Sequence, residues 1–140
     1  AIDRVGVMLS LNFPAGPELE KLSVKSNAVF KIKPSMKNTD CSLSGVENKC
    51  KKMLTENYEK SDIALFCIDS VIAALDGMYK ALMPKYGALP VVFSGGVTSN
   101  KRIKNYFHDK YNAIFAEPAY SADNAAGTAV LSSIMYDRRK

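Results

Sequence analysis

The stretch SDIALFCIDSVIAALDGMYKALM, residues 61–83, is the most apolar segment of the chain and predicts a long helix at the centre of the fold. Ser61 and Asp62 can cap its start, and we expect it to end before Pro84 because proline cannot continue a helix. Two aspartates interrupt the apolar run, which falls short of the roughly 20 apolar residues that span a membrane. We therefore expect a largely buried helix in a soluble protein, and no membrane partner.

The segments after this helix alternate between strand and helix patterns. Two short apolar runs predict buried strands, and a segment with helical spacing follows each of them. In order they are ALPVVFSGG (88–96), KRIKNYFHDKY (101–111), YNAIFAEP (111–118) and AYSADNAAGTAVLSSIMYD (119–137), the last beginning as a loop. This order predicts an α/β fold with parallel strands, rich in helix and with a small sheet.

The segments before the central helix predict shorter elements. A helix at the start of the chain must end at NFPAGP, and Pro17 can open the next helix because the first turn needs no N–H from it. The expected elements are a helix at 1–11, a short helix at 18–22, a strand at 28–32, a polar, turn-rich stretch at 34–44 and a helix at 45–58.

The composition indicates a single globular domain over residues 1–140. With 47% hydrophobic and 24% charged residues, the chain lies in the ordinary globular range. Cys41, Cys50 and Cys67 show no CxxC spacing, which fits neither a disulfide framework nor a zinc site and favours the reducing cytoplasm. The net charge of +5 permits a polyanionic partner without requiring one.

The segment SGGVTSN, residues 94–100, carries polar residues where an α/β sheet would hold a ligand. A strand ends in Gly95 and Gly96 and a helix follows, so that backbone could approach a bound polar group. The alternative is a tight turn with Thr98 or Ser99 as the helix cap. The sequence is compatible with both interpretations.

Asp123, in SADNAAGTA, precedes a helix rich in small residues. It can cap that helix or supply one oxygen ligand to a metal, although one carboxylate cannot build a metal site alone. His108 is the only histidine and no HExxH motif occurs, so a zinc peptidase centre cannot be formed. No nucleophile elbow is present, and we assign no residue a catalytic role.

Three segments in order resemble the motifs of one family, and DCSLSG (40–45) is a fourth match. They are AIDRVGVMLSLNFPAGPELEKL (1–22), SGGVTSNKRI (94–103) and EPAYSADNAAGTAV (117–130). The family is the glycoprotease-like group, also called O-sialoglycoprotein endopeptidase or TsaD, whose characterised members transfer a threonylcarbamoyl group to adenosine in tRNA. The resemblance implies the C-terminal part of an actin-like ATPase (RNase H-like) fold without its N-terminal lobe.

The resemblance also implies site residues. The nucleotide- or substrate-binding set would be Asp3, Gly16, Glu20, Gly95, Gly96 and Asn100. Within it Asp3 resembles the aspartate that contacts the ribose, whereas Asp123 resembles the metal ligand. We expect the motif segments to converge on one concave face, because strand ends gather loops at a single edge of a sheet.

For the full-length parent only, the resemblance implies one divalent metal, which could be iron, zinc or magnesium, and ATP or threonylcarbamoyl-AMP. The implied partners are tRNA and other threonylcarbamoylation proteins. A domain without its second lobe would expose apolar surface, so we also expect that the isolated, inactive chain could form a homodimer.

The chain departs from the family motifs at several places, with PAGP for PGGP, SGVEN for SGLKT, DNAAG for DNGAM and AIDRV for GEAFDK. Ala15 and Ala125 add methyl groups where glycine is expected. Two hypotheses follow: a transferase parent with a reshaped site, or a non-catalytic paralogue that binds nucleotide or a family partner and regulates assembly. No zinc motif supports the peptidase of the family's older name.

Overall fold

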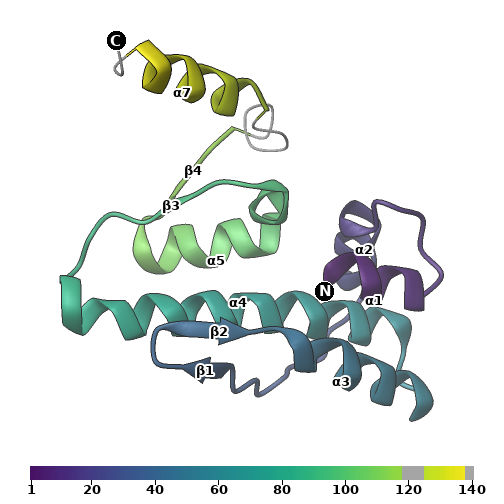
Figure 1. The fold of residues 1–140 in the computed structure, drawn as a ribbon. Helices are drawn as coiled ribbons and strands as arrows, with labels where there is room; N and C mark the ends of the chain where they lie inside the picture. Colours follow the sequence, from purple (N-terminus) through teal and green to yellow (C-terminus); the bar gives the residue numbers. More distant parts are fainter. Residues whose placement is uncertain (118–124, 138–140) are drawn as a thin grey trace.

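The computed structural model describes residues 1–117 and 125–137, and only the backbone of residues 125–129. Helices predominate, and the described strands form two short pairs (Figure 1). The elements are α1 (Ile2–Met8), α2 (Gly16–Ser23), β1 (Ser35–Lys37), β2 (Asp40–Ser42), α3 (Ser44–Thr55), α4 (Lys60–Tyr86), β3 (Val92–Phe93), the 3-10 helix η1 (Gly96–Ser99), α5 (Lys101–Tyr111), β4 (Ile114–Phe115) and α7 (Ala125–Asp137). The fold is helix-rich α/β, as the sequence predicts.

Helix α4 is the longest described element, and most others pack against it. It contacts α1, α2, α3, α5 and both strands of the β1–β2 hairpin (Figure 1). Its buried residues are Ile63, Ala64, Leu65, Cys67, Ile68, Ser70, Val71, Ile72, Ala74 and Asp76. The predicted central helix is therefore confirmed. Among the described residues, no helix is long and apolar enough to cross a membrane.

The two ends of α4 differ from the prediction. The helix begins at Lys60, one residue early, with Glu59 at its N-cap, so Ser61 and Asp62 lie inside the first turn and no side chain caps the start. The Asp62 carboxylate accepts a hydrogen bond from the Ser26 hydroxyl. Pro84 lies inside the last turn and does not end the helix. This turn is exposed to solvent, which can satisfy the carbonyl that the proline leaves without an N–H partner.

The segment after α4 forms the predicted strand, helix, strand unit. Strands β3 and β4 are parallel, with Val92 opposite Ile114 and Phe93 opposite Phe115. The centre of the Phe93 ring lies 4.8 Å from that of Phe107, a fully buried residue of α5. Helix α5 therefore lies between α4 and the strand pair (Figure 1).

The strand predicted at 28–32 is wrong as a paired strand, since those residues are extended but join no sheet. The hairpin of β1 and β2 forms instead inside the stretch predicted to be turn-rich. Lys37 pairs with Asp40 across a two-residue turn, and Asn38 takes the left-handed conformation, at φ 57°, that asparagine tolerates. Strands of three residues give too little alternation to be visible in the sequence.

Helices α1 and α2 pack closely because Gly6 has no side chain. A Cβ on Gly6 would lie only 2.1 Å from the Cβ of Ala15, which is fully buried. The Asp3 carboxylate fixes the same turn, since its Oδ1 accepts a hydrogen bond from the backbone N–H of Ala15 at 2.9 Å. The methyl group that departs from the family motif therefore points into the α1–α2 interface.

We expect Gly6→Ala to lower the free energy of unfolding by about 2 kcal/mol, because overpacking outweighs the gain in helix propensity. Ala15→Gly should cost about 1 kcal/mol through the lost methyl contacts and the freer backbone. The double variant moves the methyl group across the interface and should recover most of the loss. Urea unfolding of the four proteins measures this coupling, and strictly additive effects would contradict the contact.

Candidate functional site

Helix α2 and the loop before α5 meet through Glu20. Its Oε1 accepts a hydrogen bond from the backbone N–H of Lys101, the first residue of α5, at 2.8 Å. A carboxylate in this place also complements the positive end of the helix dipole. The structure thus brings together two of the family-like segments, PAGPELE and SGGVTSN.

Asn100 serves as the N-cap of α5. Its Oδ1 accepts a hydrogen bond from the Ile103 N–H at 3.1 Å, and only 9% of the residue is exposed. The cap predicted at Thr98 or Ser99 is therefore wrong by one or two residues. The Thr98 hydroxyl instead donates to the Gly95 carbonyl and closes the η1 turn.

The backbone conformation requires glycine at one of the two glycine positions of this loop and not at the other. Gly95 has φ 104°, a conformation that only glycine adopts readily, so the turn requires it. Gly96 has no such requirement, and a Cβ built there would meet nothing within 4 Å. Backbone conformation therefore explains the glycine at 95, whereas neither conformation nor packing requires the one at 96, which stays open to a role in binding.

The other predicted site residues do not all line the same hollow. Asp3 lines a shallow hollow with Val7 and Phe13 on the α1 and α3 surface, whereas Glu20 lines a separate groove. Gly16 opens α2, and a Cβ there would stand 3.9 Å from Ile2, an ordinary contact. Asp123 lies outside the described residues, so its place relative to the others stays a prediction.

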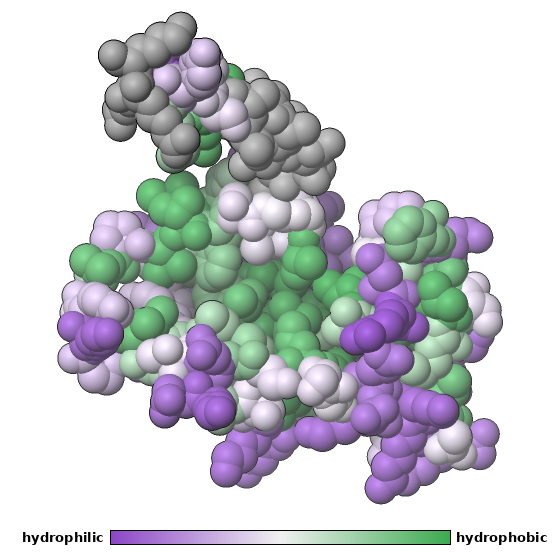
Figure 2. Space-filling model, viewed as in Figure 1, coloured by the Kyte–Doolittle hydropathy of each residue, from purple (hydrophilic) through white to green (hydrophobic). Residues whose placement is uncertain are grey.

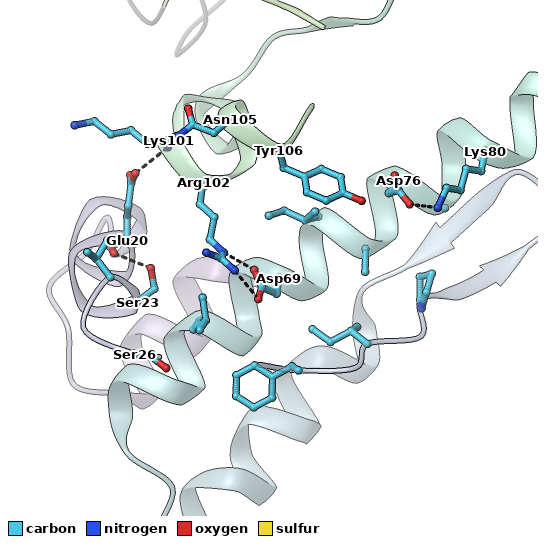
Figure 3. Close-up of a pocket in the computed structure, with 18 residues that line it drawn as sticks. Glu20, Ser23, Ser26, Asp69, Asp76, Lys80, Lys101, Arg102, Asn105 and Tyr106 are labelled. Carbon is cyan, nitrogen blue, oxygen red and sulfur yellow. Dashed lines mark hydrogen bonds and ion pairs between the residues drawn. The ribbon is translucent and has the colours of Figure 1, made fainter. Parts of the chain in front are cut away.

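The larger hollow is a groove of about 990 Å³ between α2, α4, α5 and residues 26–34 (Figure 3). Its apolar lining includes Phe30, Ile32, Pro34, Leu65, Ile72 and Ala73. Charged side chains, among them Asp69, Lys80 and Arg102, line the same groove, which is therefore apolar at its floor and polar at its rim. Figure 2 shows the opposite face of the molecule, where hydrophobic surface in the centre is surrounded by hydrophilic residues.

Four of the charged side chains that line the groove form two ion pairs. Arg102 donates two hydrogen bonds to Asp69, at 2.6 and 3.1 Å, and so ties α5 to α4 (Figure 3). Asp76 accepts from Lys80 at 2.6 Å and from Lys110 at 2.9 Å. In the sequence, Asp69 and Asp76 were recognisable only as interruptions of an apolar run. Their spacing of seven residues, two helical turns, was the signal that they share a face.

Asp76 is the most strongly perturbed carboxylate of this cluster. Burial opposes its ionisation, but hydrogen bonds from Lys80, Tyr111 and Lys110 outweigh burial and hold the pKa of Asp76 well below its usual range. Burial and then the bond to Asp76 raise the pKa of Tyr111 to about 12. The cluster therefore stays ionised and joined across the neutral pH range.

The described residues contain no group of three His, Cys, Asp or Glu side chains that could hold a metal. The cysteines are free thiols, as expected. Cys50 and Cys67 are buried between α3 and α4, where the hydrogen bond between them lowers the pKa of Cys50 and raises that of Cys67. These thiols belong to the core.

In this α/β arrangement a glycine turn at the end of a parallel strand leads directly into a capped helix, which is where open α/β sheets commonly bind ligands. The family model described as TsaD, tRNA N6-adenosine threonylcarbamoyltransferase, matches residues 1–130. The chain therefore belongs to the TsaD family.

Several curated relatives carry the name tRNA N6-adenosine threonylcarbamoyltransferase. Those of Kosmotoga olearia and Thermococcus kodakarensis are 28% and 30% identical to this chain over 100% and 97% of its length. The protein of Buchnera aphidicola is 31% identical over 97% of the chain. In each case the chain spans 44% of the relative, less than half of its length.

We expect Asp76→Asn to lower the free energy of unfolding at pH 7 by about 2 kcal/mol, since it leaves two lysines without their shared carboxylate. The folded pKa of Asp76 is depressed, so its stabilisation is present above the ordinary carboxyl pKa of about 4 and is lost as the pH falls below it. The difference from wild type should therefore shrink at pH 3.

Urea unfolding at pH 7 and pH 3 measures this effect. Asp109→Asn is the matched control, because that side chain is exposed and contacts only the neighbouring His108 among the described residues. It should change stability little at either pH. A loss in Asp76→Asn of equal size at both pH values would show that packing, and not charge, holds this end of the groove.

Proposed function

We propose that this chain forms the C-terminal nucleotide- and metal-site part of a cytoplasmic tRNA N6-adenosine threonylcarbamoyltransferase with an actin-like ATPase fold. The observation that carries the proposal is the family match over residues 1–130, which includes both segments that the Glu20 to Lys101 hydrogen bond joins. The length of the relatives supports a further lobe outside these 140 residues.

In this proposal the family-like residues contact the nucleotide. Asp3 uses Oδ1 to hold the Ala15 N–H, and its exposed carboxylate keeps acceptor capacity for ribose hydroxyls. Gly16 stands where packing would tolerate alanine, so its lack of a side chain suits a backbone that a ligand approaches. Asn100 keeps its amide as a donor after its oxygen has capped α5.

The proposed metal would bind Asp123, with its other ligands outside the described residues. When bound, a divalent ion would polarise the threonylcarbamoyl group and neutralise charge on the nucleotide. In the proposed reaction the adenine N6 of tRNA forms a bond to the carbamoyl carbon, the bond to AMP oxygen breaks, and N6 loses a proton. This chain would orient the adenylate during that exchange.

The departure at Ala15 does not weaken the transferase hypothesis. Its methyl group is fully buried and packs toward Gly6, away from either hollow's open surface. The alternative, a non-catalytic paralogue that regulates assembly, then depends on Ala125, whose side chain is not described. Measuring transfer by the full-length protein separates the two hypotheses.

The exposed apolar side chains of α7 favour burial of this helix against another lobe or chain in the assembled protein. The exposed fraction is between 44% and 64% for each of Val130, Leu131, Ile134, Met135 and Tyr136. Apolar surface of this kind is commonly buried against another lobe or chain. The proposed partners are the second lobe, tRNA and other threonylcarbamoylation proteins, and a homodimer when the second lobe is absent.

In the full-length protein, we expect Gly16→Ala to leave the fold intact and to weaken threonylcarbamoyl-AMP binding by about tenfold through its added methyl group. Gly45→Ala is the matched control, because a Cβ at Gly45 in α3 meets nothing within 4 Å and one at Gly16 makes only an ordinary contact with Ile2. Calorimetry and a tRNA transfer assay make the comparison. Equal affinity and activity in both variants would remove Gly16 from the site.

A further inference from the structure

Residues 28–34 form an extended segment that lies against the groove without belonging to a sheet. Its side chains alternate, with Phe30, Ile32 and Pro34 partly buried in the groove and the residues between them exposed. Val29 is 94% exposed. The segment thus has the side-chain pattern of a strand with one face against the protein.

The backbone of this segment has no partner in the part of the chain that the structure describes. The last hydrogen bond before it is from the Ala28 N–H to the Ser26 hydroxyl, and the next ladder begins at Ser35 in β1. Residues 29–34 therefore continue β1 backward as a strand with open C=O groups and, except at Pro34, open N–H groups. Such an edge is a template for another strand.

The groove beside this edge offers a surface suited to the side chains of an added strand. Leu65, Ile72 and Ala73 of α4 form its apolar floor, and α5 forms the opposite wall (Figure 3). Asp69 pairs with Arg102 and Asp76 with Lys80, so these four charges at its rim are balanced within the groove. An occupant of the groove therefore needs apolar side chains on one face.

The outer face of the segment is strongly basic. Lys25, Lys31, Lys33 and Lys37 are all exposed, and no acidic residue occurs between Glu20 and Asp40. None of these lysines forms an ion pair with another described residue. The charge at this edge favours an occupant with acidic side chains on its outer face.

We propose that residues 28–34 are a docking strand for an extended acidic peptide segment of a partner protein, which pairs with the open backbone and places alternate apolar side chains in the groove. A second copy of the chain would set lysine opposite lysine and is disfavoured. RNA would match the lysines but would use neither the apolar floor nor the open amides. The groove shares Glu20 with the predicted nucleotide-binding set, whereas residues 28–34 themselves belong to no predicted site.

The direct probe is a fluorescein-labelled peptide of seven residues in which Glu and Val alternate. We expect saturable binding to the chain by fluorescence anisotropy, together with slower hydrogen exchange at alternate amides among residues 29–33, the ones whose N–H groups face the added strand. The matched control peptide has the same sequence with alternate backbone nitrogens methylated, and a second has Lys in place of Glu. Both should bind at least about tenfold more weakly, because each removes one source of complementarity.

Charge reversal tests the location. Lys31→Glu with Lys33→Glu should weaken peptide binding by about tenfold, whereas the control pair Lys49→Glu with Lys51→Glu on α3 should not. Absence of saturable binding, equal binding of the N-methylated peptide, or equal effects of the two lysine pairs would overturn the proposal. So would displacement of the peptide by a tRNA oligonucleotide that protects the same amides, which would assign this edge to RNA.

Discussion

Burial of the long apolar helix α4 is the constraint on which the rest of the structure depends. Burial of each inward side chain stabilises the folded state by roughly 1.5 to 3 kcal/mol. This gain requires other elements to cover several faces of the helix at once. Helices α1, α2 and α3 cover one part and α5 another. The elements that carry the family-like motifs are therefore positioned first by packing on α4 and only then by polar contacts.

Hydrogen bonds and ion pairs between the helices determine how α5 is oriented within this packing. Glu20 links α2 to the start of α5, while Arg102 and Lys110 connect α5 back to Asp69 and Asp76 of α4. These bonds fix the orientation of α5, whose first turn follows the glycine loop directly. The position of that loop thus follows from a hydrophobic frame and a few charged hydrogen bonds around one groove.

The elements predicted correctly are those with a strong local signal. The apolar spacing of α4, the proline at the start of α2 and the strand, helix, strand order after residue 88 were all visible in the sequence. The hairpin was missed because its strands are short, and segment 28–32 was taken as a paired strand because alternation cannot show whether a partner strand exists. Family motifs identified candidate site residues, but not that Asn100 caps a helix or that Gly6 accommodates Ala15, which depend on tertiary contacts.

In the proposed function, this chain provides one wall of a nucleotide site and needs the second lobe to complete it. Calorimetric titration of ATP with Mg²⁺ into the 140-residue chain, and in parallel into the full-length protein, tests this claim. A half-site buries too little of the ligand, so the chain alone should show no binding stronger than about 1 mM while the full-length protein binds. Micromolar binding by the chain alone would contradict the claim.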